Sequence, residues 1–191
     1  MRSPLNKRLF RELRGEYGKY LVIFILMTLS IGIVSGFLVA DGSMIRAYNE
    51  SFEKYNIENG HFRTEKKMNN AQIQDVEDMG VKLYENYYVE EALTNGSTMR
   101  IFKNRDQVNK VCLMKGKMPA KPGEIGIDRM YADNNDLSVG DKIESDGHTW
   151  EITGLVALSD YSALFENNND SMFDSVKFGV SVVCPEEFDS Y

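Results

Sequence analysis

The chain has 191 residues, a hydrophobic fraction of 42% and a formal net charge of −7, which is enough for one medium-sized domain plus an extra element. The charge is unevenly distributed. Residues 1–19 carry +4 and residues 20–40 carry no charge, so residues 41–191 carry −11. A basic head, a neutral apolar segment and an acidic body are typical of a membrane protein. The acidic body would repel phosphate backbones, which argues against a nucleic-acid partner.

The first 19 residues predict a short amphipathic helix. Ser3 is a suitable N-cap and Pro4 a suitable first helical residue, and apolar residues recur at every fourth position from Leu5 to Tyr17. We expect this helix to lie on the inner leaflet of the cell membrane, where anionic lipid attracts its basic side chains. These side chains are Arg2, Lys7, Arg8, Arg11, Arg14 and Lys19.

Residues 20–40 predict a transmembrane helix. The 21 residues carry no charge, and at about 1.5 Å per residue a helix of this length matches a bilayer core of about 30 Å. The apolar region of a signal peptide is only about 7–15 residues long, so we expect the helix to be retained. Cleavage after Ala40 is the alternative. The basic head predicts a cytoplasmic N-terminus, with residues 41–191 outside the cell.

Small residues recur at every fourth position of this segment and would line one face of the helix. Small side chains let a second helix approach closely, which favours helix packing in lipid. The alternative is that glycine is simply common in transmembrane helices. The residues of this predicted packing face are Thr28, Gly32, Gly36 and Ala40.

The apolar spacing of three to four residues continues beyond the membrane, from Met44 to Tyr55. It predicts that the helix extends as an extracellular stalk over residues 41–59, with Gly60 as a stop signal. Residues 60–191 then predict a strand-rich α+β domain. The expected fold is therefore α+β: an amphipathic helix, then one transmembrane helix that continues as a stalk into a mixed domain.

The predicted elements of this domain follow in chain order. We expect a strand at 60–65, a helix over 69–80 capped by Asn69 or Asn70, and a strand within 81–93. Asn95-Gly96 suits a type I′ hairpin turn to a returning strand at 98–103. Further strands are expected within 109–119, where a turn follows, at 124–128, 138–145 and 148–158, and within 176–188, where the strand leads into Pro185; a short helix is expected at 129–136 and a second hairpin at Asp146-Gly147.

The sequence offers little for catalysis. His61 and His148 are 87 positions apart and neither has a second metal ligand at short spacing, so solvated or capping histidines are expected. The Asp- and Asn-rich segments 133–141 and 166–174 do not fit a calcium-binding loop and indicate turns. No catalytic residue, metal or cofactor is predicted. Cys112 and Cys184 are expected to be buried free thiols, and one disulfide bridge is the alternative for an extracellular domain.

The segment 159–174 mixes aromatic and acidic residues and has no clear period. Aromatic side chains in a polar loop are candidates for contact with a partner protein, and here they are Tyr161, Phe165 and Phe173. The alternative is that the loop folds over the core of its own domain.

The segment from residue 116 to residue 158 resembles the core-domain signature of FtsX-like and MacB-like ABC transporter permeases. In that family a Gly-Arg/Lys-x-Pro turn leads to Pro-Gly-Glu-Ile, a short helix, Leu-x-Val-Gly-Asp and a strand that ends in Gly-Leu/Ile-Val. The basic head, membrane helix and extracellular domain occur in the same order, so the resemblance covers essentially the whole chain. The matching residues are Gly116, Lys117, Pro119, Pro122, Gly123, Glu124, Ile125, Leu137, Val139, Gly140, Asp141, Gly154 and Val156.

The resemblance implies a non-enzymatic permease subunit with a MacB-like periplasmic core domain. Such subunits form homodimers or heterodimers and pair with a cytoplasmic ATPase, whose ATP hydrolysis drives export, extraction of a membrane-bound substrate or signalling. The family has at least three more membrane helices after the core domain, including the segment that docks on the ATPase. This chain reaches Tyr191 before them, so we expect the core domain to be incomplete. The alternatives are a single-pass extracellular interaction module and a secreted enzyme released after Ala40.

Overall fold

The computed structural model describes residues 11, 14–161, 163–167 and 169–191. The chain forms two compact units, Met1–Glu50 and Ser51–Tyr191. The first contains most of a long apolar helix and the second contains a mixed sheet with short helices. The predicted α+β class is therefore confirmed.

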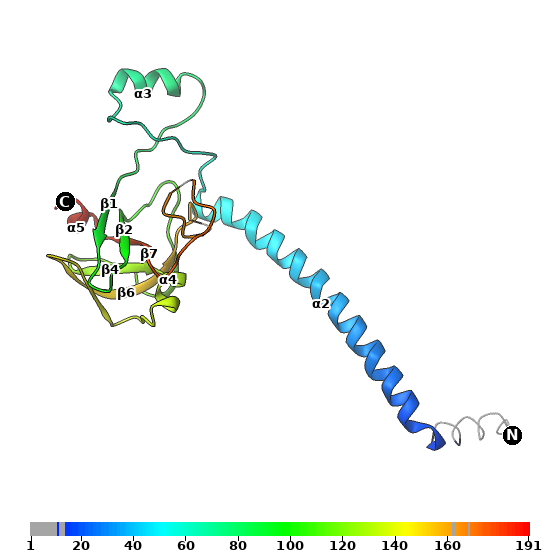
Figure 1. Ribbon diagram of the computed structural model, residues 1–191. Coiled ribbons are helices and arrows are strands. Elements are labelled where there is room, and N and C mark those ends of the chain that lie inside the picture. Colours follow the sequence, from blue (N-terminus) through cyan, green and yellow to red (C-terminus); the bar gives the residue numbers. More distant parts are fainter. Residues whose placement is uncertain (1–10, 12–13, 162, 168) are drawn as a thin grey trace. The chain divides into compact units, whose positions relative to one another are not determined.

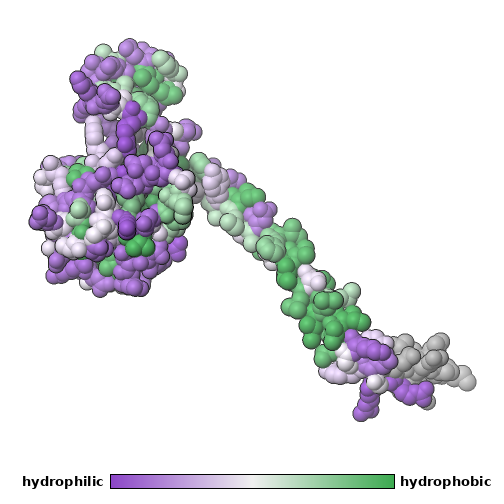
Figure 2. Space-filling model, viewed as in Figure 1, coloured by the Kyte–Doolittle hydropathy of each residue, from purple (hydrophilic) through white to green (hydrophobic). Residues whose placement is uncertain are grey.

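Helix α2 (Tyr17–Tyr55) has 39 residues and covers both the apolar segment and most of the predicted stalk without interruption. It is long and apolar enough to cross a membrane, and Figure 2 shows its apolar residues gathered along its middle part. The hydroxyl groups of Thr28 and Ser30 donate to the carbonyl oxygens of Phe24 and Leu26, four residues earlier. These two hydroxyl groups thus find partners within the helix itself.

The helix ends at Tyr55, several residues before the predicted stop at Gly60. Asn56 takes a left-handed conformation, with φ of 48°, and the N–H of Ile57 donates to the carbonyl of Phe52 at 3.1 Å. This six-residue closure is the Schellman arrangement, in which asparagine can replace glycine. The predicted stop was placed too late because Asn56 ends the helix before Gly60 is reached.

The basic head is described only in part. Arg11 and Arg14 have helical backbone and Glu16 forms a bend before α2 begins. Lys19 pairs with Glu16 at 2.9 Å. Arg2, Lys7 and Arg8 lie outside the described residues, so the amphipathic helix over residues 1–19 stays a prediction.

The second unit is built on seven strands in the order β1-β2-β7-β4-β6-β3, with β5 also paired to β6 (Figure 1). The pairs β2–β7 and β4–β6 are parallel and the others are antiparallel. The strands are β1 (Tyr88–Ala92), β2 (Thr98–Lys103), β3 (Cys112–Gly116), β4 (Glu124–Asp128), β5 (Lys142–Glu144), β6 (Thr149–Ala157) and β7 (Phe178–Val183). The short helices are α3 (Asn70–Glu77), α4 (Arg129–Asn134) and α5 (Pro185–Phe188).

The sheet curls back on itself beyond β5. Leu93, directly after β1, forms an isolated bridge with Ser145, and Thr94 N–H donates to the carbonyl of Glu144 at 2.9 Å. The Ser145 hydroxyl donates to Glu91, which also pairs with His148 Nδ1 at 2.9 Å. The strands thereby surround a core in which the largest fully buried side chains are Trp150, Tyr131, Phe102 and Met99.

Most predicted elements of this unit are confirmed, and two are corrected. Asn69 caps α3 through a reciprocal capping box with Gln72, as the sequence indicated. The β1–β2 hairpin forms, but only Gly96 has positive φ (81°), while Asn95 does not. The turn is therefore not type I′, which needs both central residues at positive φ. Residues 60–65 form no strand, and Phe62 is exposed, so this segment buries no apolar face against the sheet.

Candidate functional site: the junction after helix α2

The residues that follow α2 are bound to the loop between β2 and β3. Lys110 N–H donates to the carbonyl of Tyr55 at 2.9 Å, and Asn109 N–H donates to the carbonyl of Asn56 at 3.1 Å. The Asn56 side-chain amide donates in turn to the carbonyl of Gln107 at 2.7 Å. Carbonyl groups in the last turn of a helix lack partners within the helix, so this loop both caps the helix and holds its end.

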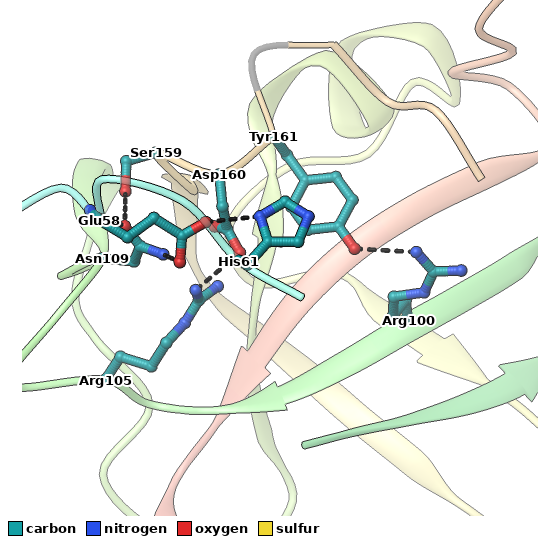
Figure 3. A network of polar contacts seen from close by, with 8 residues as sticks. All are labelled: Glu58, His61, Arg100, Arg105, Asn109, Ser159, Asp160 and Tyr161. Carbon is teal, nitrogen blue, oxygen red and sulfur yellow. Dashed lines mark hydrogen bonds and ion pairs between the residues drawn. The ribbon is translucent and has the colours of Figure 1, made fainter. Parts of the chain in front are cut away.

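Asn109 is the centre of this junction (Figure 3). Its side chain is buried, and its backbone has a φ of 50°. Its Oδ1 accepts from Glu58 N–H at 3.0 Å, and its Nδ2 donates to Glu58 Oε2 at 2.7 Å. Ser159 Oγ adds a longer contact to Oδ1 at 3.4 Å. The amide thus joins the helix exit to the loop that follows β6.

His61 extends the junction toward solvent. Its Nδ1 lies 2.7 Å from Glu58 Oε1, and two thirds of its side chain is exposed. This agrees with the solvated histidine expected from the sequence. Within the described residues no group of three or more His, Cys, Asp and Glu side chains could hold a metal ion.

A second contact between the same two loops is the ion pair of Arg105 and Asp160, whose nearest atoms are 2.8 Å apart. Both side chains are almost buried, with 11% and 12% exposed, and the Arg105 guanidinium lies 4.8 Å from the centre of the Phe102 ring. Arg105 Nε and Nη2 and Asp160 Oδ1 have no hydrogen-bond partner within the described part of the chain. The pair is therefore only partly satisfied, although desolvating it is costly.

Arg100, on β2, holds the next part of the same loop. Its guanidinium donates to Tyr161 Oη at 2.8 Å, to the carbonyl of Glu166 at 2.9 Å and to Glu90 Oε1. Burial lowers the pKa of Arg100, but the bonds to Tyr161 and Glu90 outweigh it, so the pKa is raised overall. Burial also raises the pKa of Tyr161 against the opposing effect of Arg100. Both groups therefore stay protonated at neutral pH, and the hydrogen bond between them does not depend on pH in that range.

These contacts fall into three neighbouring groups, centred on Asn109, Arg105 and Arg100, and together make up the polar network between the end of α2, β2 and the loop after β6. The network contains an amide, ion pairs and backbone bonds, and its only histidine is exposed. It has no activated nucleophile beside a base, which catalysis by acyl transfer would need. The arrangement binds Tyr55, Asn56 and Glu58, at and after the helix end, to the loop between β2 and β3.

Of the residues that the sequence predicted to be functional, Tyr161 belongs to this network, and the other described residues lie outside it. Thr28, Gly32, Gly36 and Ala40 lie on α2 and are exposed. A Cβ atom built on Gly32 or Gly36 would meet nothing within 4 Å. This face is therefore open to a second helix, and helix packing through it stays a prediction.

The three predicted partner-contact residues separate into two kinds. Tyr161 is half-buried, and its hydroxyl and ring are occupied by Arg100 and by Phe102, at a ring distance of 5.8 Å. Phe165 and Phe173 are exposed and pack edge to face, with ring centres 6.0 Å apart. Only the two phenylalanines present open apolar surface.

Several of the residues that carry the permease resemblance meet at one corner of the sheet, where β3, β4 and β6 join. Gly116 has a φ of 80°, and a Cβ there would lie 2.3 Å from the carbonyl oxygen of Thr153. A Cβ on Gly154 would lie 2.5 Å from the carbonyl of Lys117. Glu124 accepts from Ala120 N–H at 2.9 Å and pairs with Lys117 at 3.3 Å. The motif thus specifies a tight chain crossing.

The two cysteines are both free. Cys184 is buried, and burial raises the pKa of its thiol. Cys112 is partly exposed and accepts a hydrogen bond from the Tyr55 hydroxyl at 2.9 Å. The expectation of free thiols is confirmed for both, and that of burial for Cys184 alone.

The junction itself was missed in the sequence. Asn56, Glu58, Arg105, Asn109 and Asp160 belong to ordinary polar loops, and their partners are about 50 or more positions away. The one available signal was the position of Asn56 directly after the last residue of the apolar helical spacing, where asparagine commonly ends a helix.

No family model, no curated protein and no solved structure matches this chain. The class of the protein is therefore stated from its fold. It is an α+β protein in which one helix, long and apolar enough to cross a membrane, runs without a break into the junction of a curled mixed sheet.

Proposed function

We propose that this chain is the N-terminal part of an FtsX-like or MacB-like ABC transporter permease. In this proposal α2 crosses the cell membrane with the basic head in the cytoplasm, and residues 41–191 lie outside. A cytoplasmic ATPase drives the complete permease, which works as a dimer, and the outer domain is a MacB-like core domain. The resemblance around residues 116–158 supports the family, and the basic head supports the orientation.

The observation that carries the proposal is the unbroken helix from Tyr17 to Tyr55, whose end is held by the Asn109 junction. A single anchor would need only the apolar part of this helix. A continuous helix that is hydrogen-bonded at its outer end can pass a tilt or a displacement to the outer domain, because an α-helix is stiff over this length. Export, substrate extraction and signalling all require such transmission.

The orientation is tested by labelling single cysteines in intact cells. In a Cys112→Ser background, Asp146→Cys reports on the outer domain and Arg14→Cys on the head; both positions are exposed. A membrane-impermeant maleimide should label Asp146→Cys in intact cells and label Arg14→Cys only after lysis. Labelling of Arg14→Cys in intact cells would contradict the orientation. Loss of residues 1–40 from the purified protein would instead indicate a secreted domain.

Coupling is tested with a break in the stalk. Proline inside a helix removes a hydrogen bond and costs about 3 kcal/mol, so Ala47→Pro should interrupt α2 without touching the sheet. We expect the tagged complete permease, purified from native membranes in mild detergent, to bring an ATPase with it. Proteolysis of its outer domain should then change on addition of ATP. Ala47→Pro should abolish that change, whereas the control Ala47→Ser should preserve it.

Two outcomes would contradict the proposal in different ways. If no ATPase is recovered with the protein, the chain is a single-pass interaction module instead. If the ATP-dependent proteolysis pattern survives Ala47→Pro, the permease assignment stands but the stalk does not transmit the motion.

A further inference from the structure

The loop between β6 and β7 presents an exposed apolar patch that the junction does not use. We define the acidic-aromatic patch as Phe165, Met172, Phe173 and Val176 together with the carboxylates Glu166, Asp170 and Asp174. The four apolar side chains are 37%, 83%, 46% and 51% exposed. Four large exposed apolar residues within twelve positions are unusual on a soluble domain surface, where such residues are normally scattered.

The patch stands on a fixed base. Leu164, next to Phe165, is buried in the core, and Arg100 donates to the carbonyl of Glu166 at 2.9 Å. At the far end, Asn134 Nδ2 donates to Ser175 Oγ at 2.6 Å. Both ends of the patch are therefore fastened to the sheet unit. A surface that is already ordered loses less entropy on binding, so the exposed patch is suited to recognition of a partner.

The patch is negative throughout. Residues 163–176 contain Glu166, Asp170 and Asp174 and no Lys, Arg or His. One carboxylate oxygen of Asp170 accepts from Asn167 N–H, and one of Asp174 accepts from Val176 N–H. The second oxygen of each takes part in no hydrogen bond within the described residues. Apolar rings bordered by available carboxylates match a ligand that has apolar and cationic side chains side by side.

We propose that the acidic-aromatic patch binds a cationic amphipathic segment of a partner protein or peptide, with apolar side chains against the Phe165–Phe173 pair and Lys or Arg side chains against the carboxylates. The same negative charge disfavours nucleic acid and anionic lipid. A symmetric contact between two copies would place one acidic patch against another, so it disfavours that occupant too. This inference does not depend on the permease assignment, because it uses only the sheet unit.

The probe is a fluorescent 14-residue peptide of Lys and Leu with helical spacing, titrated against the full chain in nanodiscs of zwitterionic lipid. Empty nanodiscs supply the background, and a Glu/Leu peptide of the same spacing supplies the charge control. We expect saturable binding of the Lys/Leu peptide that weakens as salt is raised, and no binding of the Glu/Leu peptide above background.

The variants locate the site. The pair Phe165→Ser with Phe173→Ser should weaken binding about tenfold or more, as truncation of central aromatic contacts does. Glu166→Gln with Asp170→Asn should weaken binding several-fold and flatten its salt dependence. The matched control is Met79→Ser with Val81→Ser, two exposed apolar residues outside this loop. It should change affinity less than twofold.

Three results would overturn the proposal. The first is unchanged affinity in the double phenylalanine variant when its far-ultraviolet circular dichroism matches the wild type. The second is an equal loss in the Met79/Val81 control, which would indicate general attraction to an acidic protein. The third is self-association in sedimentation that is abolished by the phenylalanine changes, which would make a second copy the occupant. None of these results bears on ATPase recovery, so failure here and failure of the permease proposal are distinguishable.

Discussion

Asn109 and Glu58 hold each other by two reciprocal hydrogen bonds: Glu58 N–H donates to Asn109 Oδ1 at 3.0 Å, and Asn109 Nδ2 donates to Glu58 Oε2 at 2.7 Å. Glu58 lies three residues beyond the end of α2, and Asn109 lies in the loop between β2 and β3. This pair links the chain that leaves the helix to the loop that leads into β3. The first prediction concerns this link.

Replacing Asn109 by alanine should lower the free energy of unfolding of the sheet unit by about 1–3 kcal/mol. The change leaves the partly buried Glu58 N–H without its acceptor, and alanine tolerates a φ of 50° less well than asparagine. Thermal unfolding followed by circular dichroism measures the effect. Gln107→Ala is the control, because only the backbone carbonyl of Gln107 takes part in the junction. Equal stability of the two variants would show that the Asn109–Glu58 hydrogen bonds do not contribute to the free energy of unfolding.

For the ion pair of Arg105 and Asp160 we expect that each single replacement destabilises the protein and that the double replacement does not. Arg105→Met alone or Asp160→Leu alone should destabilise the protein by about 3–5 kcal/mol, because each leaves an uncompensated charge in a nearly buried site. The double variant should be about as stable as the wild type, since three atoms of the pair are already unsatisfied. Denaturant unfolding of the four proteins gives the coupling energy. Additive losses in the double variant would contradict this interpretation.

Glu124 predicts a pH dependence of stability with a definite sign. Its pKa is lowered from 4.5, first by the Ala120 N–H and then by Lys117 and Lys121. A carboxylate whose folded pKa is depressed adds stability above its unfolded pKa, and that stability is lost as the pH falls through the folded value. The difference in unfolding free energy between wild type and Glu124→Gln should therefore be constant above about pH 4.5 and shrink below it.

Comparing wild type with Glu124→Gln separates the contribution of Glu124 to the pH dependence from the contributions of other titratable groups. Asp128 has a raised pKa because it is buried, so its contribution changes with pH in the opposite direction. The Asp128 contribution is common to both proteins and cancels in their difference. A difference that grows as the pH falls below 4.5 would be the wrong sign for the described contacts of Glu124.

The small-residue face of α2 predicts helix association in the membrane. Gly32→Leu with Gly36→Leu should reduce crosslinking between cysteines placed along that face in the full-length protein, because bulky side chains keep the helices apart. The unfolding temperature of the sheet unit should not change, since a Cβ at either position meets nothing within 4 Å. Met27→Leu with Val34→Leu is the control on the opposite face of the helix, where both side chains are exposed. Unchanged crosslinking in the glycine variant would contradict the packing idea.

Local patterns in the sequence were sufficient for most of the elements. The 21 uncharged residues from 20 to 40 predicted a long helix, Asn69 predicted the start of α3, and Asp146-Gly147 predicted the turn between β5 and β6. Each of these signals acts over a few neighbouring residues. The strand expected at 60–65 failed because a strand needs a partner edge, and neighbouring residues cannot indicate whether one is available.

Contiguous segments of the sequence were enough to predict the apolar helix, the charge asymmetry and the α+β class, because helix length, side-chain charge and turn residues are local properties. The strand order, the curling of the sheet and the junction of Asn109 with Glu58 became visible in the folded chain alone. The fold also brings Tyr161 to Arg100 while Phe165 and Phe173 stay exposed. The curling of the sheet, the junction and the Tyr161–Arg100 contact join residues about 50 or more positions apart, and polar contacts of that kind are fixed by packing and desolvation rather than by local preference.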